Sequence, residues 1–290
     1  MPLIAEKHFA GRQCLGKRKM QEDAYAFSEV TVGDGGEKGL LLVIADGMGG
    51  HMAGNQASEL AVRMFVAAFH RGGATMRARF AEALDVANGA IAEAIDADPD
   101  HREGMGTTLL GVALTPAGLE WISIGDSPLY LWRAGELQRL NADHSFRPIL
   151  QDMIERHELT PEQAATSSLR NRLRAALIGG EMAMIDASSE PLALLQGDVI
   201  LAGTDGVQTL SDAAIAAALA KCTATDAAGI AIDLLRAVLE ADKPKQDNAT
   251  VAILQPPAEG ISSSAFDPTG DDVATRRRPR EGLPHSSASP

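Results

Sequence analysis

The 290-residue chain has few cysteines, few aromatic residues and no long apolar run. Its two cysteines, Cys14 and Cys222, lack the spacing of a zinc site or a disulfide framework, so we expect both to be structural and the protein to be cytoplasmic. The longest apolar runs, residues 40–45 and 213–220, fall well short of the ~20 residues that cross a bilayer. We therefore expect no membrane span. We also expect no export, because the first residues lack the apolar core of a signal peptide.

Clustered positive charge is also scarce. The formal net charge is -13 and the pI is near 5.0. Because contacts to many phosphates need clustered Lys and Arg, we do not expect nucleic acid as a partner. From residue 255 onward the chain is rich in proline, serine and arginine and has almost no aliphatic residues. We expect residues 255–290 to form a disordered tail and residues 1–254 to form one domain.

The strands predicted from the sequence form consecutive hairpins. An apolar segment at residues 39–45 is typical of a buried strand. Short turns separate two further pairs of predicted strands, 107–115 with 119–125 and 129–133 with 136–140, and single strands are expected at 198–202 and 249–254. Consecutive hairpins indicate antiparallel pairing and exclude a doubly wound parallel sheet.

Apolar residues recur at three- and four-residue spacing in four segments, which predicts helices over residues 54–70, 77–97, 211–221 and 226–240. Ser211 is expected to cap the third helix. Strands occur near both chain ends, so both ends are expected to contribute to one sheet system. We predict an α+β fold in which helices cover antiparallel sheets.

Acidic residues lie at four separate places in the sequence, each at the end of an apolar run or in an adjoining turn: Glu22-Asp23, Asp46-Gly47, Asp205-Gly206 and Asp247-Asn248. Carboxylates that converge repel one another unless cations neutralise them. A single Asp-Gly is often a turn in which the aspartate bonds its own backbone. The arrangement recurs beside three predicted strands, however, which favours a site for hard divalent cations.

Seven short segments occur in an order that identifies a family: 18–23 (RKMQED), 46–54 (DGMGGHMAG), 106–108 (GTT), 125–127 (GDS), 143–145 (DHS), 204–206 (TDG) and 247–250 (DNAT). Each segment is a weak signal alone, and the ordered set is specific. The chain resembles the metal-dependent protein serine/threonine phosphatases of bacterial type, the PPM or type 2C family, over about residues 10–254. The resemblance implies a four-layer α-β-β-α sandwich of two antiparallel sheets flanked by helices.

The resemblance also implies two Mn²⁺ or Mg²⁺ ions bridged by Asp46. The Gly47 carbonyl and Glu22 would bind on one side, and Asp205 and Asp247 on the other. Two hard cations roughly 3.5 to 4 Å apart make hydroxide available near neutral pH and neutralise phosphoryl oxygens. Water would then attack phosphorus in line, and the serine or threonine alkoxide would leave.

Four further residues receive roles from the resemblance. Asp23 would orient metal-bound water from the outer shell. Asp126, together with Asp205, matches the site of a third, weaker metal in bacterial relatives. Arg18 matches the phosphate-binding arginine, although it could instead belong to a solvated basic run. Eukaryotic relatives place a histidine where Met48 stands here, and His51 comes later, as in bacterial relatives. The proton donor is therefore left unassigned, with His51 as a candidate.

Residues 146–180 correspond to the mobile flap beside the family's active site. This polar helical insert carries several arginines, which could steer a phosphopeptide or simply lie on the surface. His144 is expected to order a loop. Pro128 stands where many relatives have arginine, which is a departure from the family pattern close to Asp126.

The leading hypothesis is hydrolysis of phosphoserine and phosphothreonine in proteins, reversing a bacterial Ser/Thr protein kinase. The expected partners are phosphorylated proteins, namely such a kinase and its substrates, and the chain is expected to be a monomer. One alternative is a catalytically silent phosphoprotein-binding module of the same fold. The other is a di-metal phosphodiesterase acting on nucleotides.

Overall fold

The computed structural model describes residues 3–32, 36–49, 52–100, 102 and 104–257. Almost all of the expected tail therefore lies outside the described residues. The elements in chain order are β1 Phe9–Cys14, β2 Asp23–Val32, β3 Glu37–Met48, α1 Ala53–Arg71, α2 Met76–Ala97, β4 Gly106–Thr107, β5 Leu109–Thr115, β6 Gly118–Ile124, β7 Leu129–Arg133, β8 Glu136–Arg139, α3 Arg147–Glu155, α4 Pro161–Thr166, β9 Asp186–Ala187, β10 Val199–Gly203, the 3-10 turn η1 Asp205–Thr209, α5 Asp212–Lys221, α6 Ala227–Glu240 and β11 Ala249–Leu254.

The strands form two antiparallel sheets, which confirms the predicted α+β class. One sheet has the order β1-β11-β10-β7-β8, and the other has the order β2-β3-β5-β6-β9, with β4 beside β3. Strand β1 pairs with β11 from Phe9 opposite Leu254 to Cys14 opposite Ala249, so both chain ends share one sheet, as predicted. The two predicted hairpins, β5-β6 and β7-β8, lie in different sheets. The chain thus crosses between sheets at residues 125–128.

Strand β3 shows how the sheets become stacked. Successive side chains of a strand point to opposite faces. Leu40, Leu42 and Ile44 pack in a cluster with side chains of β7, β10 and β11 in the other sheet. Leu41 and Val43 pack instead in a cluster with helices α1 and α2. A strand that is apolar on both faces is therefore an inner layer between a helix layer and a second sheet.

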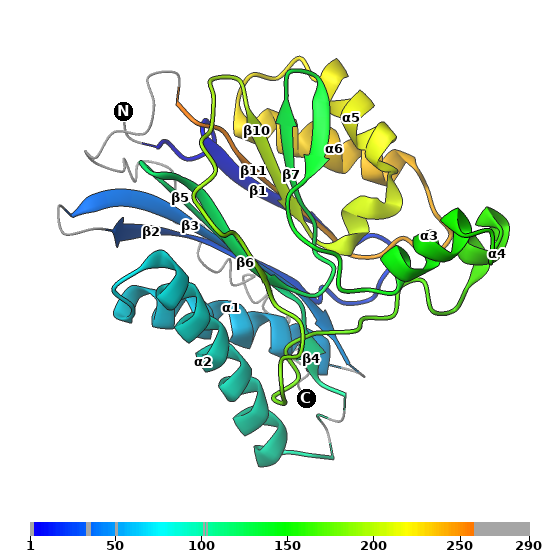
Figure 1. Ribbon diagram of the computed structural model, residues 1–290, viewed down its shortest axis with the longest axis horizontal. Coiled ribbons are helices and arrows are strands. Elements are labelled where there is room, and N and C mark those ends of the chain that lie inside the picture. The colour runs from blue at the N-terminus through cyan, green and yellow to red at the C-terminus, as the bar shows by residue number, and fades with distance from the viewer. Residues whose placement is uncertain (1–2, 33–35, 50–51, 101, 103, 258–290) are drawn as a thin grey trace, which may run out of the picture.

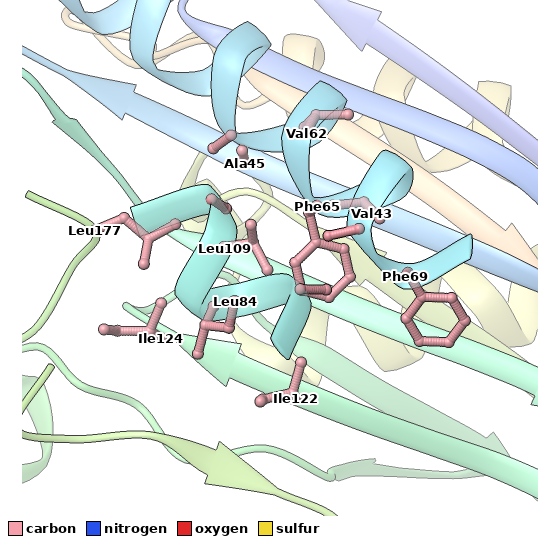
Figure 2. Close-up of a cluster of buried hydrophobic side chains, with 14 of the residues drawn as sticks. Val43, Ala45, Val62, Phe65, Phe69, Leu84, Leu109, Ile122, Ile124 and Leu177 are labelled. Carbon is pink, nitrogen blue, oxygen red and sulfur yellow. The ribbon is translucent and has the colours of Figure 1, made fainter. Parts of the chain in front are cut away.

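Helices cover the outer faces of both sheets (Figure 1). Helices α1 and α2 lie against the six-stranded sheet, and α5 and α6 lie against the five-stranded sheet, which confirms the four-layer sandwich. Figure 2 shows Phe65 and Phe69 of α1 near Val43 of β3 and Ile122 of β6. The short helices α3 and α4 stand beside the sandwich instead of covering a sheet (Figure 1).

The predicted helices agree closely with those observed. Helices α1, α2, α5 and α6 each begin and end within one residue of the predicted bounds. Ser211 caps α5, since its hydroxyl accepts a hydrogen bond from the Ala214 N–H at 3.2 Å. The sequence-based prediction missed β1 and β2. No helix in the described part of the chain is long and apolar enough to span a bilayer.

Candidate metal centre

The fold gathers the predicted acidic residues at one end of the two sheets. Asp23 begins β2 and lies directly opposite Asp46 of β3. Asp126 lies where the chain crosses from β6 to β7, Asp205 follows β10, and Asp247 precedes β11. Asp46 is influenced by the charges of all four of the others. Residues spread over more than 200 positions of sequence therefore meet in one site.

Two glycines bring the backbones of these segments close together. A Cβ atom on Gly47 would clash with the carbonyl of Gly54, and one on Gly206 would clash with the carbonyl of Asn248. Only glycine permits this approach without a shift of the neighbouring backbone. The Glu22 N–H donates to Asn248 Oδ1 at 2.8 Å, which joins the segment before β2 to the one before β11. The Asp-Gly pairs are thus needed for packing of the site as well as for its charge.

Asp46 carries the strongest electrostatic strain in the site. Its backbone N–H donates to Thr108 Oγ1 at 2.9 Å, and the Thr107 hydroxyl donates to its carbonyl at 2.9 Å, so the strand holds it in place. Asp46 is half-buried. Burial, followed by repulsion from Asp205 and the other carboxylates, raises the pKa of Asp46 well above its ordinary value. Side-chain hydrogen bonding with Asp46 opposes the rise in the pKa of Asp205.

Asp23 lies deeper and connects the two sheets. Its Oδ2 accepts hydrogen bonds from the hydroxyls of Thr204 and Thr250, at 2.8 and 2.7 Å. Burial raises the pKa of Asp23 to about 7 despite these two donors. A buried carboxyl group that is held by two hydroxyls is well ordered, which suits an orienting role. That role remains a prediction.

Two arginines lie against the carboxylates. Arg18 forms an ion pair with Asp247, and its Nη1 lies 4.0 Å from Glu22 Oε2. Arg147 Nη2 lies 2.9 Å from Asp126 Oδ2. Sequence reasoning missed Arg147, although one signal was present. A cation at the first position of a helix opposes the helix dipole, so it needs a nearby anion.

The donor set fits a hard divalent cation, because it consists of carboxylate and carbonyl oxygens that repel one another until a cation is added. Among the described residues, however, no group of three or more His, Cys, Asp or Glu side chains is arranged to hold a metal ion. Carboxylates of the site pair instead with guanidinium groups. The ligand assignments to Glu22, Asp46, Gly47, Asp126, Asp205 and Asp247 therefore remain predictions. His51 lies outside the described residues.

The other residues singled out in the sequence have structural roles. His144 is buried, and its Nδ1 accepts a hydrogen bond from the Gly125 N–H at 3.2 Å. The His144 N–H donates in turn to the Gly125 carbonyl at 3.0 Å. His144 therefore orders the loop that carries Asp126, as expected. Pro128 begins the return into β7, and its carbonyl accepts from the Gly203 N–H at 3.1 Å.

The comparisons with known proteins agree with this architecture. The family model for protein phosphatase 2C matches residues 10–240. The chain is 35% identical over 218 residues to the serine/threonine protein phosphatase PstP of Mycobacterium tuberculosis, covering 73% of this chain and 40% of PstP. It is 32% identical over 174 residues to the protein phosphatase PhpP of Streptococcus pneumoniae, covering 59% of this chain and 68% of PhpP.

A solved structure of the PstP catalytic domain in complex with two manganese ions superposes with a TM-score of 0.66 at 32% identity, covering 85% of this chain and 96% of that one. The four-layer fold and the acidic site define a protein of the phosphatase 2C class. The chain belongs to the protein phosphatase 2C family. It spans about 40% of the length of PstP, so PstP contains further sequence beyond this match.

Proposed function

We propose that this chain hydrolyses phosphoserine and phosphothreonine in proteins with the help of Mn²⁺ or Mg²⁺. The observation that carries the proposal is the convergence of Asp23, Asp46, Asp126 and Asp205 on one site, where burial, followed by repulsion between carboxylates, raises their pKa values. A protein tolerates such repulsion at a functional site, where a bound cation relieves it. Membership of the protein phosphatase 2C family assigns the chemical class.

Glu22, Asp46, the Gly47 carbonyl, Asp205 and Asp247 would hold the two ions, which supply a low-pKa water and neutralise phosphoryl charge. The remaining steps belong to the protein. Arg18 is exposed and paired with Asp247, so its guanidinium is free to turn to a phosphate and hold two of its oxygens. Asp23 stays in place because two hydroxyls hold it.

The proposal includes the partners and setting expected from the sequence. The substrates are phosphorylated proteins, including a Ser/Thr protein kinase and its targets. PstP and PhpP are both named as protein phosphatases, which supports this substrate class. The enzyme acts as a monomer in the cytoplasm, and the two free cysteines agree with a reducing compartment. The proton donor to the leaving alkoxide stays open, with His51 as the candidate.

The test is a substrate panel with and without MnCl₂. It compares peptides carrying phosphoserine, phosphothreonine or phosphotyrosine with cyclic nucleotides and a generic aryl phosphate. We expect manganese-dependent release of phosphate from the phosphoserine and phosphothreonine peptides. Turnover of cyclic nucleotides alone would replace the proposal with a phosphodiesterase. Manganese binding without any turnover would indicate the silent binding module.

A further inference from the structure

Arg147 is a largely buried cation at the first position of α3, and it faces acidic groups from three other segments. Its Nη2 lies 2.9 Å from Asp126 Oδ2 and 3.5 Å from Asp205 Oδ2, while its Nη1 lies 3.7 Å from Asp143 Oδ2. The Nη1 group also donates to Gln208 Oε1. Its side chain is only 16% exposed. This guanidinium group is thus inserted into the site and does not reach out to solvent.

The position is unfavourable for a cation unless these carboxylates compensate it. Burial removes hydration from the guanidinium group. The α3 helix dipole adds positive potential at the same end. The carboxylates of Asp126, Asp143 and Asp205 are therefore needed to keep Arg147 where it is. In return, Arg147 opposes the rise in the pKa of both Asp126 and Asp205, so it acts on them as a counter-cation.

We infer that Arg147 is an internal cation for the Asp126–Asp205 pair, so that a divalent ion binds this pair only by displacing the guanidinium group. The inference rests on the proposed function in treating the pair as a metal site. The guanidinium group and the divalent ion would each contact Asp126 Oδ2 and Asp205 Oδ2, and they cannot occupy that space together. Arg147 would therefore set how tightly the pair binds a metal ion.

Arg139 keeps Asp143 paired with a cation when Arg147 is displaced. Its Nη1 lies 3.1 Å from Asp143 Oδ2, and its Nη2 donates to the Asp126 carbonyl at 3.0 Å. Asp143 therefore keeps a cation when Arg147 moves away. Only the Asp126 and Asp205 carboxylates lose their partner, and these are the two that the arriving ion would neutralise.

The displacement also bears on the segment that contains α3 and α4. The two ends of this segment are clamped together, because the Phe146 N–H donates to the Arg172 carbonyl at 3.1 Å and the Arg174 N–H donates to the His144 carbonyl at 2.8 Å. Arg147 follows directly after this clamp and adds a side-chain tie to the sandwich. Releasing Arg147 would loosen the first turn of α3.

The experiment measures Mn²⁺ binding by titration calorimetry, without substrate, in the wild type, Arg147→Gln and Arg156→Gln. Arg156 is the matched control, because it ends the same helix and pairs with Asp152 at an exposed position. We expect Arg147→Gln to strengthen the weakest Mn²⁺ binding step by on the order of tenfold, the scale of one charge-assisted hydrogen bond. Arg156→Gln should leave that step unchanged.

An Asp126→Asn background isolates the pair in a double-mutant cycle. We expect Arg147→Gln to have no further effect on Mn²⁺ binding there. Equal affinities of wild type and Arg147→Gln, or the same gain with and without Asp126, would overturn the inference. If Arg147→Gln does not fold, Arg147→Lys provides the test. It keeps the charge but loses the fork geometry, and it should bind Mn²⁺ more tightly than the wild type by a smaller factor.

Hydrogen exchange provides a second readout. The Leu150 N–H donates to the Phe146 carbonyl at 3.0 Å and closes the first turn of α3. We expect Mn²⁺ to speed exchange of this amide in the wild type, and it should exchange fast in Arg147→Gln even without the ion. Slower exchange on adding Mn²⁺ to the wild type would count against displacement. None of these readouts requires turnover. If the chain released no phosphate in the substrate panel but gave the expected Mn²⁺ binding and exchange results, the proposed function would be disproved and the inference about Arg147 would stand.

Discussion

The same side chain behaves differently at different places in this molecule, and aspartate shows it best. Burial raises the pKa of Asp126 to about 7, with repulsion from Asp205 adding to it and Arg147 opposing it. Burial would also raise the pKa of Asp198, but hydrogen bonds from Arg133 and from the Leu195 N–H outweigh it and lower that pKa. Asp198 is thus a satisfied structural group, whereas Asp126 lies among competing carboxylates. The surroundings of each aspartate therefore distinguish a residue of the acidic site from a structural residue.

Asp46→Asn is expected to abolish activity while stabilising the metal-free protein. The change removes a predicted metal ligand, so kcat/KM on a phosphoserine peptide should fall by more than about 100-fold, beyond the usual effect of an outer-shell partner. It also removes a buried carboxyl group that four others repel, so Tm in EDTA should rise. The backbone bonds of this residue to Thr107 and Thr108 are kept.

Asp85→Asn is the matched control, since Asp85 is an exposed residue of α2. It should change neither the turnover nor the melting temperature. Near-normal manganese-dependent turnover of Asp46→Asn would show that the ligand assignment is wrong. A lower Tm of that variant in EDTA would contradict the electrostatic argument.

Titration of His144 makes one contribution to the pH dependence of stability. Burial lowers the pKa of His144 below its ordinary value of 6.5, so the folded state binds fewer protons than the unfolded state just below that pH. The contribution of His144 to the free energy of unfolding should therefore fall as pH drops below about 6.5, until the folded pKa is reached. His144→Asn keeps an acceptor for the Gly125 N–H but cannot titrate, and it should remove this contribution from the profile.

Urea unfolding at several pH values between 7.5 and 5 provides the measurement. His157→Asn is the control, because His157 is exposed and has a φ of 60°, which asparagine tolerates. The pKa of His8 is also lowered, and burial raises the pKa values of Asp23 and Asp126 to about 7, which changes stability in the opposite direction. The comparison is therefore the difference between each variant and the wild type. Parallel profiles for wild type and His144→Asn would reject the prediction.

Packing between elements depends on where side chains are missing as well as on where they are present. Phe65 of α1 is fully buried and stacks on Phe69 at a centroid distance of 6.2 Å. It lies over Gly111 of β5, where a Cβ atom would come within 2.7 Å of the Phe65 Cζ. The helix can therefore approach the sheet closely because this strand position has no side chain.

Gly111→Ala should destabilise the protein by about 1–3 kcal/mol, because the added methyl group overpacks the core against Phe65. Guanidinium chloride unfolding provides the measurement. Gly89→Ala is the matched control, since a Cβ on Gly89 of α2 meets nothing within 4 Å. That change should stabilise the protein by up to about 1 kcal/mol, as alanine favours a helix. Equal changes in the free energy of unfolding for the two variants would show that the contact with Phe65 does not cause the destabilisation.

For the whole molecule, the acidic residues lie at one end of both sheets, and the five-stranded sheet needs both ends of the chain. Strand β1 covers the edge of β11 along its length. The residues before β1 also cap α6, because the carbonyls of Lys7 and Glu6 accept hydrogen bonds from the N–H groups of Ala227 and Ala228, at 3.0 and 2.9 Å. The N-terminal segment therefore holds together parts of the protein that lie more than 200 residues away.

Removing residues 1–14 should prevent stable folding, because it exposes the edge of β11 and the first turn of α6. Removing the chain after Pro257 should leave Tm and phosphopeptide turnover unchanged, because β11 ends at Leu254. Circular dichroism melting of both truncated proteins provides the measurement. A cooperative, wild-type-like melt after the N-terminal deletion would show that β1 is dispensable.

The sequence by itself determined the local elements and the chemical identity of the site. The four helices that cover the sheets, the two hairpins and Ser211 as a cap follow from periodicity and turn residues, which depend on neighbours a few positions away. The acidic segments and their order also indicated hard-metal chemistry. Such features are readable because each is encoded within a short stretch of chain.

Only the tertiary structure decided which distant segments these short stretches pair with or contact. Strand β1 is short and contains Gly11 and Arg12, so its identity depends on pairing with β11 at the far end of the chain. The assignment of the two hairpins to different sheets likewise depends on long-range pairing. Arg147 looked like one of several flap arginines until folding placed it against Asp126 and Asp205. Distance in space has no local signal in sequence, because it arises from the summed packing of every layer.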